Sequence, residues 1–459
     1  MTEQQIELLQ NQQQGGPVEC LGMTFESDEA RREYFLEILR EKLKDPEFRQ
    51  IEGFPIGEDE DILALSDPPY YTACPNPFLE QFIECYGKPY DPETDDYHRE
   101  PFAADVSEGK GDALYNAHSY HTKVPHKAIM RYILHYTDPG DIVLDGFAGS
   151  GMTGVAAQMC GSPDQKFKTL IESERKTDGL PPASWGARRV FLNDLSPAAT
   201  FISANYNLPF DLSTFEKEAQ NILSILRQEY GWMYQTTHPK SKSKAEINYT
   251  VWSEVFSCPE CGSDIVFVKE ALDRKTKKTR KEFPCPSCGS RHTKNDLQRL
   301  FETLIDPATS QPWKRIKLHP VLINYKVGKK QFEKEPDDQD FQVLEKIEQL
   351  SLPPKIPTDQ FPIKAMYHGS RLEPKGFTRV NHLFLPRSLQ ALGFLWERAW
   401  SIKDHRIRKM ALYFVEQAIW GMSLLARYAP THYSQVNQYL SGVYYVGSQI
   451  AECSPWYIL

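Results

Sequence analysis

Residues 141–154 have the sequence DIVLDGFAGSGMTG, which predicts a buried β-strand, a glycine-rich turn and the start of a helix. The strand part is a short continuous apolar run, as expected of a strand covered on both faces. Glycines let the backbone turn tightly and approach a ligand, and the helix that follows offers unpaired N–H groups. We therefore expect a nucleotide-like cofactor at the carboxyl end of this strand.

The segments around this motif predict a parallel α/β sheet. A helical pattern at 126–136 precedes the motif, and a strand at 189–194 and a helix from about Ala198 follow it. Strands that alternate with helices are typical of a parallel sheet. The short apolar run at 62–65 predicts a further buried strand. The expected fold class is α/β, with a Rossmann-like sheet, an inserted zinc ribbon and a helical C-terminal region.

Asp194 follows the second predicted strand and would accept hydrogen bonds from ribose hydroxyls. It lies much further from Asp145 than the roughly 20 residues that separate the equivalent groups in dinucleotide folds. A polar insertion at 161–187 would account for the difference. The loop lacks the Lys-Ser/Thr pair of a P-loop and the GxGxxG spacing, which makes phosphate binding less favoured. A glycine turn with a purely structural role is the alternative.

A second motif, Ser66-Asp67-Pro68-Pro69-Tyr70, ends the predicted strand at 62–65. Two prolines cannot continue a sheet ladder and they fix the backbone, so nearby carbonyl groups are free for other partners. A carboxylate, a rigid carbonyl and an aromatic ring together suit an aromatic amine, whose N–H groups need acceptors. A plain strand terminator is the alternative. The glycine motif elsewhere in the chain favours the amine-binding interpretation.

Two cysteine pairs, Cys258-x-x-Cys261 and Cys285-x-x-Cys288, have the spacing of a four-thiolate zinc site. A glycine follows each pair directly, as tight metal-binding turns require. Four sulfur ligands leave no open position for a substrate, so the predicted zinc ion is structural. His292 is expected to be a surface residue rather than a ligand.

The segment between the cysteine pairs is strongly basic, and it is a candidate phosphate-contacting hairpin. Lys240, Lys242 and Lys244 would extend the patch. A solvated loop with no ligand is the equally weighted alternative. The candidate nucleic-acid residues are Arg274, Lys275, Lys277, Lys278, Arg280 and Lys281.

Taken together, these motifs resemble those of the DNA methyltransferases that methylate the exocyclic amine of adenine or cytosine. Residues 67–70 are similar to the catalytic DPPY motif of that family, and residues 145–151 to its cofactor loop. Residues 121–125, HTKVP, resemble the segment that binds the carboxylate of the cofactor. The resemblance covers about residues 60–210, with the catalytic motif before the cofactor loop, as in one permuted class of the family.

The resemblance implies methyl transfer from S-adenosylmethionine to a base flipped out of double-stranded DNA. The carboxylate of Asp67 and the carbonyl of Pro68 would accept hydrogen bonds from the amine, and Tyr70 would stack on the base. Aspartate at position 67 favours adenine over cytosine. The implied catalytic residues are Asp67, Pro68, Pro69 and Tyr70. The implied cofactor residues are His121, Thr122, Lys123, Asp145, Phe147, Ala148, Gly149, Ser150, Gly151, Thr153, Asn193 and Asp194.

Three alternatives stay open. An RNA methyltransferase is one, because zinc ribbons bind both nucleic acids. A protein-amide methyltransferase is less favoured, because such enzymes carry asparagine at the position of Asp67. The third is a DNA-binding subunit that needs another polypeptide for catalysis. The short segment 71–120 favours this third reading, because relatives of this class hold their target-recognition region there. The apolar ending at 453–459 also favours it and suggests a chain truncated at its C-terminus.

The composition is that of an ordinary globular protein, with 40% hydrophobic residues and a net charge of −9. The sequence has no apolar run of about 20 residues and no secretory signal, so we expect a cytoplasmic protein without a membrane segment. The setting that the resemblance implies is restriction-modification or phage defence, with a cognate nuclease or other defence subunits as partners. The predicted domains are a flexible N-terminus (1–28), the methyltransferase domain (29–235), the zinc ribbon (236–300), a linker region (301–360) and a helical region (361–459).

Overall fold

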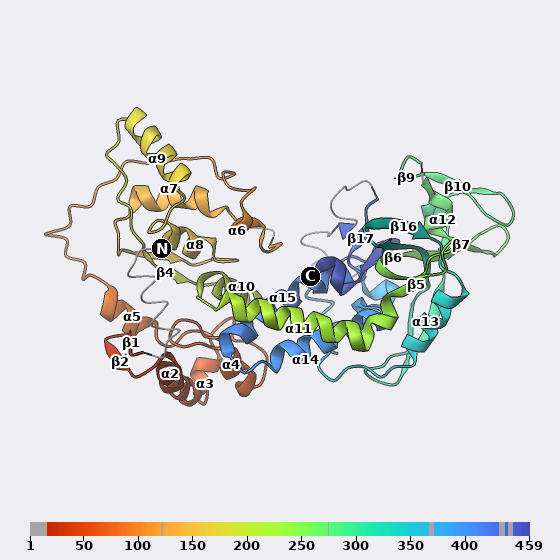
Figure 1. Ribbon diagram of the computed structural model, residues 1–459, viewed down its shortest axis with the longest axis horizontal. Coiled ribbons are helices and arrows are strands. Elements are labelled where there is room, and N and C mark those ends of the chain that lie inside the picture. The colour runs from red at the N-terminus through yellow and green to blue at the C-terminus, as the bar shows by residue number, and fades with distance from the viewer. Residues whose placement is uncertain (1–15, 121–122, 274, 367–370, 431–436, 439–443) are drawn as a thin grey trace. The chain divides into compact units, whose positions relative to one another are not determined.

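The computed structural model describes residues 16–120, 123–273, 275–366, 371–430, 437–438 and 444–459. The chain forms two compact units, unit 1 (1–210) and unit 2 (211–459) (Figure 1). The boundary between the units, after Phe210, lies earlier in the chain than the predicted end of the methyltransferase domain at 235. Within the described residues, every helix is too short or too polar to span a bilayer.

Unit 1 begins with a small helical part. Its elements are β1 (Val18–Cys20), β2 (Met23–Phe25), α2 (Asp28–Lys42), α3 (Pro46–Arg49), α4 (Asp59–Leu65) and α5 (Leu79–Tyr86). Phe35 and Leu39 of α2 pack with Ile62 and Leu63 of α4 in one buried core. The apolar spacing at 29–47 predicts an amphipathic helix that stops near Pro46, and α2 confirms it over Asp28–Lys42.

The strand predicted at 62–65 is wrong, because these residues form the C-terminal half of helix α4. Three acidic residues, Asp59, Glu60 and Asp61, occupy the first turn of α4, where they stabilise the positive end of the helix dipole. Ile62 and Leu63 are buried while the preceding turn faces solvent. A four-residue apolar run cannot distinguish a buried strand from one face of a helix.

The second part of unit 1 contains the glycine motif. Its elements are α6 (Ala113–Asn116), α7 (His126–Tyr136), β3 (Ile142–Asp145), α8 (Met152–Met159), α9 (Gln165–Thr177), β4 (Arg189–Leu192) and α10 (Pro197–Asn207). Helix α8 packs against α7, α10 and β4 (Figure 1). The segment predicted as a polar insertion contains α9, whose Phe167 and Ile171 are buried in the core beneath α7 and α8.

Strands β3 and β4 are parallel, with Ile142 opposite Arg189 and Asp145 opposite Leu192. In the described part of unit 1, this pair is the whole of the parallel sheet. The mixture of helices and strands agrees with the predicted α/β class. A complete Rossmann-like sheet stays a prediction, because a two-stranded pair does not define its strand order.

Unit 2 is built around a nine-stranded antiparallel sheet. The strands are β5 (Gln235–Thr237), β6 (Lys244–Ser257), β7 (Asp264–Val266), β12 (Gln298–Arg299), β15 (Leu318–Val327), β16 (Lys330–Lys334), β17 (Arg427–Tyr428), β18 (Asn437–Gln438) and β19 (Gln449–Cys453). The main path runs β16-β15-β6-β19-β17-β18, and β5, β7 and β12 also pair with β6. The long strand β6 is therefore the centre of the unit.

Smaller elements complete unit 2. The hairpins are β8 (Leu272–Asp273) with β9 (Lys278–Thr279), β10 (Glu282–Pro284) with β11 (Arg291–Thr293), and β13 (Phe301–Ile305) with β14 (Pro312–Ile316). The helices are α11 (Leu212–Tyr230), α12 (Phe267–Ala271), α13 (Asp338–Glu348), α14 (Pro386–Trp400), α15 (His405–Met422) and α16 (Pro455–Ile458), with short 3₁₀ turns at η1 (Gly231–Tyr234), η2 (Lys294–Asp296), η4 (Glu373–Lys375) and η5 (Asn381–Leu383). Helices α11, α14 and α15 pack against one another (Figure 1).

The structure differs from the predicted linker at 301–360, which contains β13, β14, β15, β16 and α13. Most of its charged residues are exposed or half-buried, whereas apolar residues such as Val321, Ile323 and Tyr325 of β15 are buried. The region 361–459 contains the predicted helices α14 and α15, but β17 and β19 from the same region belong to the main sheet.

A buried ion pair ties helix α14 to the centre of the sheet. The Glu452 carboxylate accepts hydrogen bonds from Arg387 Nη2, from Ser388 Oγ at 3.0 Å and from Trp252 Nε1 at 2.9 Å. Arg387 also donates to Thr250 Oγ1 at 3.0 Å. The side chains of Arg387 and Glu452 are 4% and 1% exposed, so neither charge has water as a substitute partner.

We expect Glu452→Ala to lower the free energy of unfolding of unit 2 by about 3–5 kcal/mol, because it leaves the Arg387 guanidinium buried without its counter-charge. Urea denaturation followed by tryptophan fluorescence checks this. Lys326→Ala, which breaks an exposed pair with Glu246, should cost at most about 1 kcal/mol. Equal losses for the two variants would contradict the account.

Candidate functional site

The segment 67–70 forms a tight loop after α4, closed by Asp67 and Tyr71. The N–H of Asp67 donates to the carbonyl of Tyr71 at 2.8 Å, and the N–H of Tyr71 donates back to the carbonyl of Asp67 at 3.0 Å. The Pro68–Pro69 peptide bond is cis. The Pro69 carbonyl accepts from Asn76 Nδ2 at 2.9 Å. The loop is thus held in one conformation by its own backbone.

Arg31, on helix α2, binds both of the predicted amine acceptors. Its Nη1 donates to Asp67 Oδ1 at 2.9 Å and to the Pro68 carbonyl at 2.5 Å. Its Nη2 donates to Asp28 Oδ1 at 2.8 Å. The side chains of Arg31 and Asp67 are fully buried. Burial opposes the charge of Arg31, but Asp67 and Asp28 outweigh this and raise the pKa of the guanidinium.

Tyr70 is the exposed member of the motif. The residue is 45% exposed, and the Arg31 guanidinium lies 4.6 Å from the centroid of its ring. Tyr71 points the opposite way, into the protein, and shares a hydrogen bond with Thr200 in the first turn of α10. Asp194 lies between β4 and α10, so this contact joins the loop at 67–70 to the helix that follows the predicted ribose acceptor.

The glycine loop is bound to the end of β4. The N–H of Ala148 donates to the carbonyl of Asn193 at 2.9 Å, and the N–H of Gly149 donates to Asp194 Oδ2 at 2.9 Å. Asp145 Oδ2 accepts from Thr153 Oγ1 at 2.6 Å, which fixes the start of α8. The structure therefore brings the residues predicted at 145–153 together with Asn193 and Asp194.

The glycines of the loop have different roles. A Cβ on Gly151 would lie 2.2 Å from Ser203 Oγ, and one on Gly154 would lie 2.3 Å from Asn207 Oδ1, so both are needed for close packing of α8 on α10. Gly149 has φ +53°, and a Cβ there would lie 3.1 Å from the Tyr120 ring. Tyr120, which sequence reasoning missed, therefore covers the one glycine whose N–H bonds Asp194.

Two other loop residues bear on cofactor binding. Phe147 is 84% exposed, so its ring is available to a ligand. The Ser150 hydroxyl is buried, and it has no hydrogen-bond partner within the described part of the chain. A buried unpaired hydroxyl costs about 1–3 kcal/mol. The unpaired Ser150 hydroxyl can donate and accept hydrogen bonds, as expected of a loop that binds a polar cofactor.

The predicted carboxylate-binding segment, 121–125, follows Tyr120, which lies against Gly149. His121 and Thr122 fall outside the described residues. Lys123 donates to the carbonyls of Tyr115 and His118, and burial lowers the pKa of its ammonium group. Its Nζ also lies 4.6 Å from the centroid of the Tyr115 ring, and these contacts hold Lys123 against residues 115–118.

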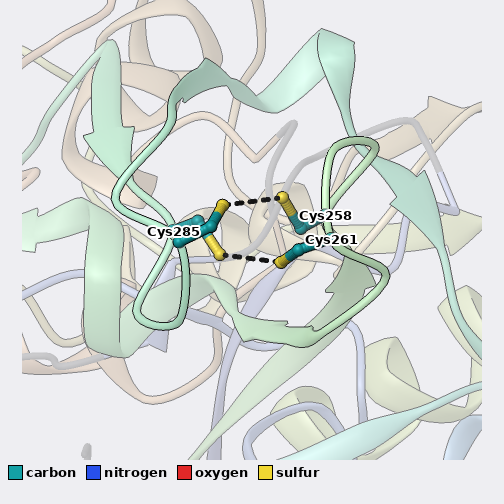
Figure 2. Close-up of side chains that lie close together, drawn as sticks. Cys258, Cys261 and Cys285 are labelled. Atoms are coloured by element: carbon teal, nitrogen blue, oxygen red, sulfur yellow. Dashed lines mark hydrogen bonds between the residues drawn. The ribbon is translucent and has the colours of Figure 1, made fainter.

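The four cysteines predicted as zinc ligands lie together in unit 2. Their sulfur atoms are all within 4.8 Å of one another. The Sγ atoms of Cys258 and Cys288 are 3.8 Å apart, and those of Cys261 and Cys285 are 3.7 Å apart. Figure 2 shows the sulfur atoms of Cys258 and Cys261 turned towards those of the other pair. A tetrahedron of Zn–S bonds of about 2.3 Å has sulfur–sulfur edges of about 3.8 Å, so the cluster fits zinc.

Two matching turns present these thiols. The N–H of Gly262 donates to the Cys258 carbonyl at 2.9 Å, and that of Gly289 donates to the Cys285 carbonyl at 3.0 Å. Both glycines have left-handed φ, at +73° and +77°. Desolvation opposes ionisation of Cys258, but the N–H of Cys261 and the Ser290 hydroxyl outweigh it and lower the pKa of the thiol to about 5.

The expectation that His292 is a surface residue is wrong. It is 7% exposed, with Nε2 3.4 Å from Cys258 Sγ and 2.7 Å from Ser290 Oγ. The alternation along β11 places it on the inner face of the β10–β11 hairpin, next to the thiol cluster. Because four thiolates would complete a tetrahedral set around zinc, we do not expect His292 to be a ligand.

The basic segment between the cysteine pairs forms the β8–β9 hairpin. Arg274 falls outside the described residues. Arg280 pairs with Asp273 at 2.9 Å, whereas the side chains of Lys278 and Lys281 face solvent. Lys275 and Lys277 line a groove of about 780 Å³ along β15 and β16, together with Lys269 and Lys334. The structure thus gathers part of this segment at a concave surface.

One protein-family model matches a segment of the chain that contains part of this site. Residues 69–163 match the model of a DNA methylase family of the N6/N4 type. This segment contains Pro69, Tyr70 and the glycine loop, and it covers about a fifth of the chain. The match supports DNA methyltransferase activity on exocyclic amines. No curated protein and no solved structure gave a significant match to the chain.

We expect one zinc ion per chain, which metal analysis of the purified protein would measure. Cys258→Ser should release the ion and lower the thermal stability of unit 2, because zinc binding contributes directly to the folding of such sites. Cys453→Ser is a matched control, since Cys453 is a buried thiol outside the cluster. Retention of stoichiometric zinc by Cys258→Ser would contradict the four-thiolate assignment.

Ser150→Ala should have opposite effects on the free and the cofactor-bound protein. Removing an unpaired buried hydroxyl should leave the free protein equally stable or more stable. The same change should weaken S-adenosylmethionine binding about five- to tenfold, because it removes a hydrogen-bonding group from the loop. Thermal unfolding with and without the cofactor, together with calorimetric titration, checks both signs. Unchanged cofactor affinity would remove Ser150 from the site.

Proposed function

We propose that the protein transfers a methyl group from S-adenosylmethionine to the exocyclic amine of a base in double-stranded DNA, with adenine favoured over cytosine. The observation that carries this proposal is the fixed pair of acceptors, the Asp67 carboxylate and the Pro68 carbonyl, beside an exposed aromatic ring. The DNA methylase match at 69–163 and the glycine loop bound to Asp194 support it.

The electrostatics around Asp67 favour an amine that becomes more positive as it reacts. Two carboxylates, Asp28 and Asp67, surround one guanidinium, Arg31, so the network carries a net charge of −1. A carboxylate oxygen and a carbonyl oxygen each accept more than one hydrogen bond. In this proposal both oxygens accept from the amine while Arg31 holds them, and base binding has to expose them, because Asp67 and Pro68 are buried here. A fixed negative field in a dry site stabilises the positive charge that develops on the nitrogen.

The glycine loop and Asp194 would hold the cofactor, which supplies an activated methyl group when it is bound. Asp194 Oδ1 and Oδ2 each accept one backbone N–H, and each retains capacity for a ribose hydroxyl. Gly149 and the unpaired Ser150 hydroxyl offer further polar contacts. In this proposal, the chain contributes positioning and electrostatics, and no side chain needs to form a covalent intermediate.

The four-cysteine cluster and the basic β8–β9 hairpin support a nucleic-acid substrate. We propose that the cluster binds a structural zinc ion and that the lysines of the hairpin contact phosphates. The aspartate at position 67 and the DNA methylase match favour DNA, and adenine within it. We also propose a host-defence role with a nuclease partner. Its support is the resemblance of the motifs to those of the methyltransferase family.

We expect Asp67→Asn to reduce methyl incorporation into unmethylated DNA by about 100-fold or more, because it removes the charged acceptor that acts in the transition state. Labelled S-adenosylmethionine gives the rate, and mass spectrometry of the digested DNA identifies the methylated base. Cofactor affinity should stay within about twofold of the wild type.

Asp28→Asn is the matched control, since it removes an equal charge from Arg31 but no predicted amine acceptor. It should reduce the rate by much less than Asp67→Asn. Equal losses would show that the ion pair, and not the acceptor, is what matters. Cofactor binding without incorporation into DNA by the wild type would instead favour a binding subunit, and incorporation into RNA alone would favour the RNA alternative.

A further inference from the structure

Four basic side chains converge at one end of the central strand of unit 2. They are Lys294 on η2, Arg299 on β12, Lys375 on η4 and Arg427 on β17, here called the cation cluster. They come from three segments that are far apart in the sequence, 294–299, 373–375 and 427–428, and lie outside the β8–β9 hairpin. None of them belongs to a motif that the sequence reasoning selected.

Glu254 on β6 organises the cation cluster. Its carboxylate is fully buried, and it accepts from Arg299 Nε at 2.7 Å and from the Ser448 hydroxyl. Lys375 Nζ lies 3.7 Å from the other carboxylate oxygen and donates to the Val446 carbonyl at 2.7 Å. One carboxylate thus holds two of the cations in fixed positions.

The other two cations reach the same place through neighbouring elements. Arg427 sits on β17 opposite Ile450 of β19, and its Cγ lies 4.0 Å from the position of a Cβ on Gly447. Gly447 stands between the two residues that bond Lys375 and Glu254. Lys294 lies 5.1 Å from the centroid of the Phe267 ring, and the charges of Glu254, Arg299 and Arg427 act on it.

The charges within the cluster do not balance. Four cations face one carboxylate, which leaves three positive charges in a partly buried place. Burial lowers the pKa of Lys375 to about 8; Glu254 opposes this, and Arg299 and Lys294 add to it. The excess positive charge reaches the surface at two residues: Arg299, whose side chain is 45% exposed, and Arg427, which is exposed. An anion with several acceptor oxygens would compensate it.

We propose that the cation cluster binds a phosphate of the DNA backbone, with Lys294, Arg299 and Arg427 as contacts and with Glu254 and Lys375 as positioning residues. The proposal rests on the proposed function only in taking DNA as the nucleic acid. A phosphate contact fits because guanidinium groups match its oxygens, and because such contacts fix the register of a protein on a duplex without reading sequence.

The test is the salt dependence of duplex binding by the full chain in the absence of S-adenosylmethionine, measured by fluorescence anisotropy. Each cation that contacts a phosphate adds about 0.9 to the slope of log affinity against log salt concentration. Lys294→Ala/Arg427→Ala should therefore lower the slope by up to about 2. Lys329→Ala/Lys330→Ala, which removes the same charge from two exposed residues of the β15–β16 hairpin, should change it less.

Charge-preserving variants and a small anion complete the design. The charge-preserving variant Lys294→Arg/Arg427→Lys should keep most of the slope. Arg427→Ala alone should lower the slope by about 0.9, so the test stays valid if the double alanine variant unfolds. Equal slopes for the cluster and control variants would overturn the proposal. So would tight binding of inorganic phosphate at the cluster with unchanged duplex affinity. Because binding is read without the cofactor, loss of methyl transfer in other variants does not affect the result.

Discussion

The buried guanidinium of Arg31 is the interaction on which the candidate active site depends. It joins helix α2 to the loop after α4, and it fixes the Asp67 carboxylate and the Pro68 carbonyl together. Two buried carboxylates would be strongly unfavourable side by side without it, since transferring an ion from water costs several kcal/mol. The two acceptors of the proposed amine site are therefore arranged before any substrate binds. Preorganised acceptors need no rearrangement during the reaction.

The motif at 67–70 could be predicted from the sequence, but its contact with Arg31 could not. The string Asp67-Pro68-Pro69-Tyr70 is local, whereas Arg31 meets Asp67 across 36 residues of chain. Arg31 lies on a helix whose amphipathic stripe was visible, but nothing in a local pattern says that one arginine faces inwards. Its burial follows from packing of α2 against α4. The acidic first turn of α4 was the local signal that 62–65 belong to a helix.

The position of the strand and glycine loop at 142–151 and the cysteine cluster were predictable for a similar reason. Each depends on residues close in sequence: an apolar run followed by glycines, or two cysteines on one turn. The predicted burial of the strand is wrong, because no residue of β3 is buried and Leu144 is 74% exposed. The sheet of unit 2 was not predictable from such signals. Its strands pair across long separations, as β6 does with β19, and its solvent-facing charges gave 301–360 the composition of a linker. The cation cluster around Glu254 arises only from these long-range pairings.

The central claim is that the loop at 67–70 and the glycine loop at 145–151 form one site around S-adenosylmethionine. Ultraviolet crosslinking of the methyl-labelled cofactor to the full chain, followed by peptide mapping, tests this most directly. The account predicts that the label is recovered on peptides that contain Tyr70 or the glycine loop, and that excess unlabelled cofactor removes it. Label found only on peptides of unit 2, or none that unlabelled cofactor displaces, would contradict the account.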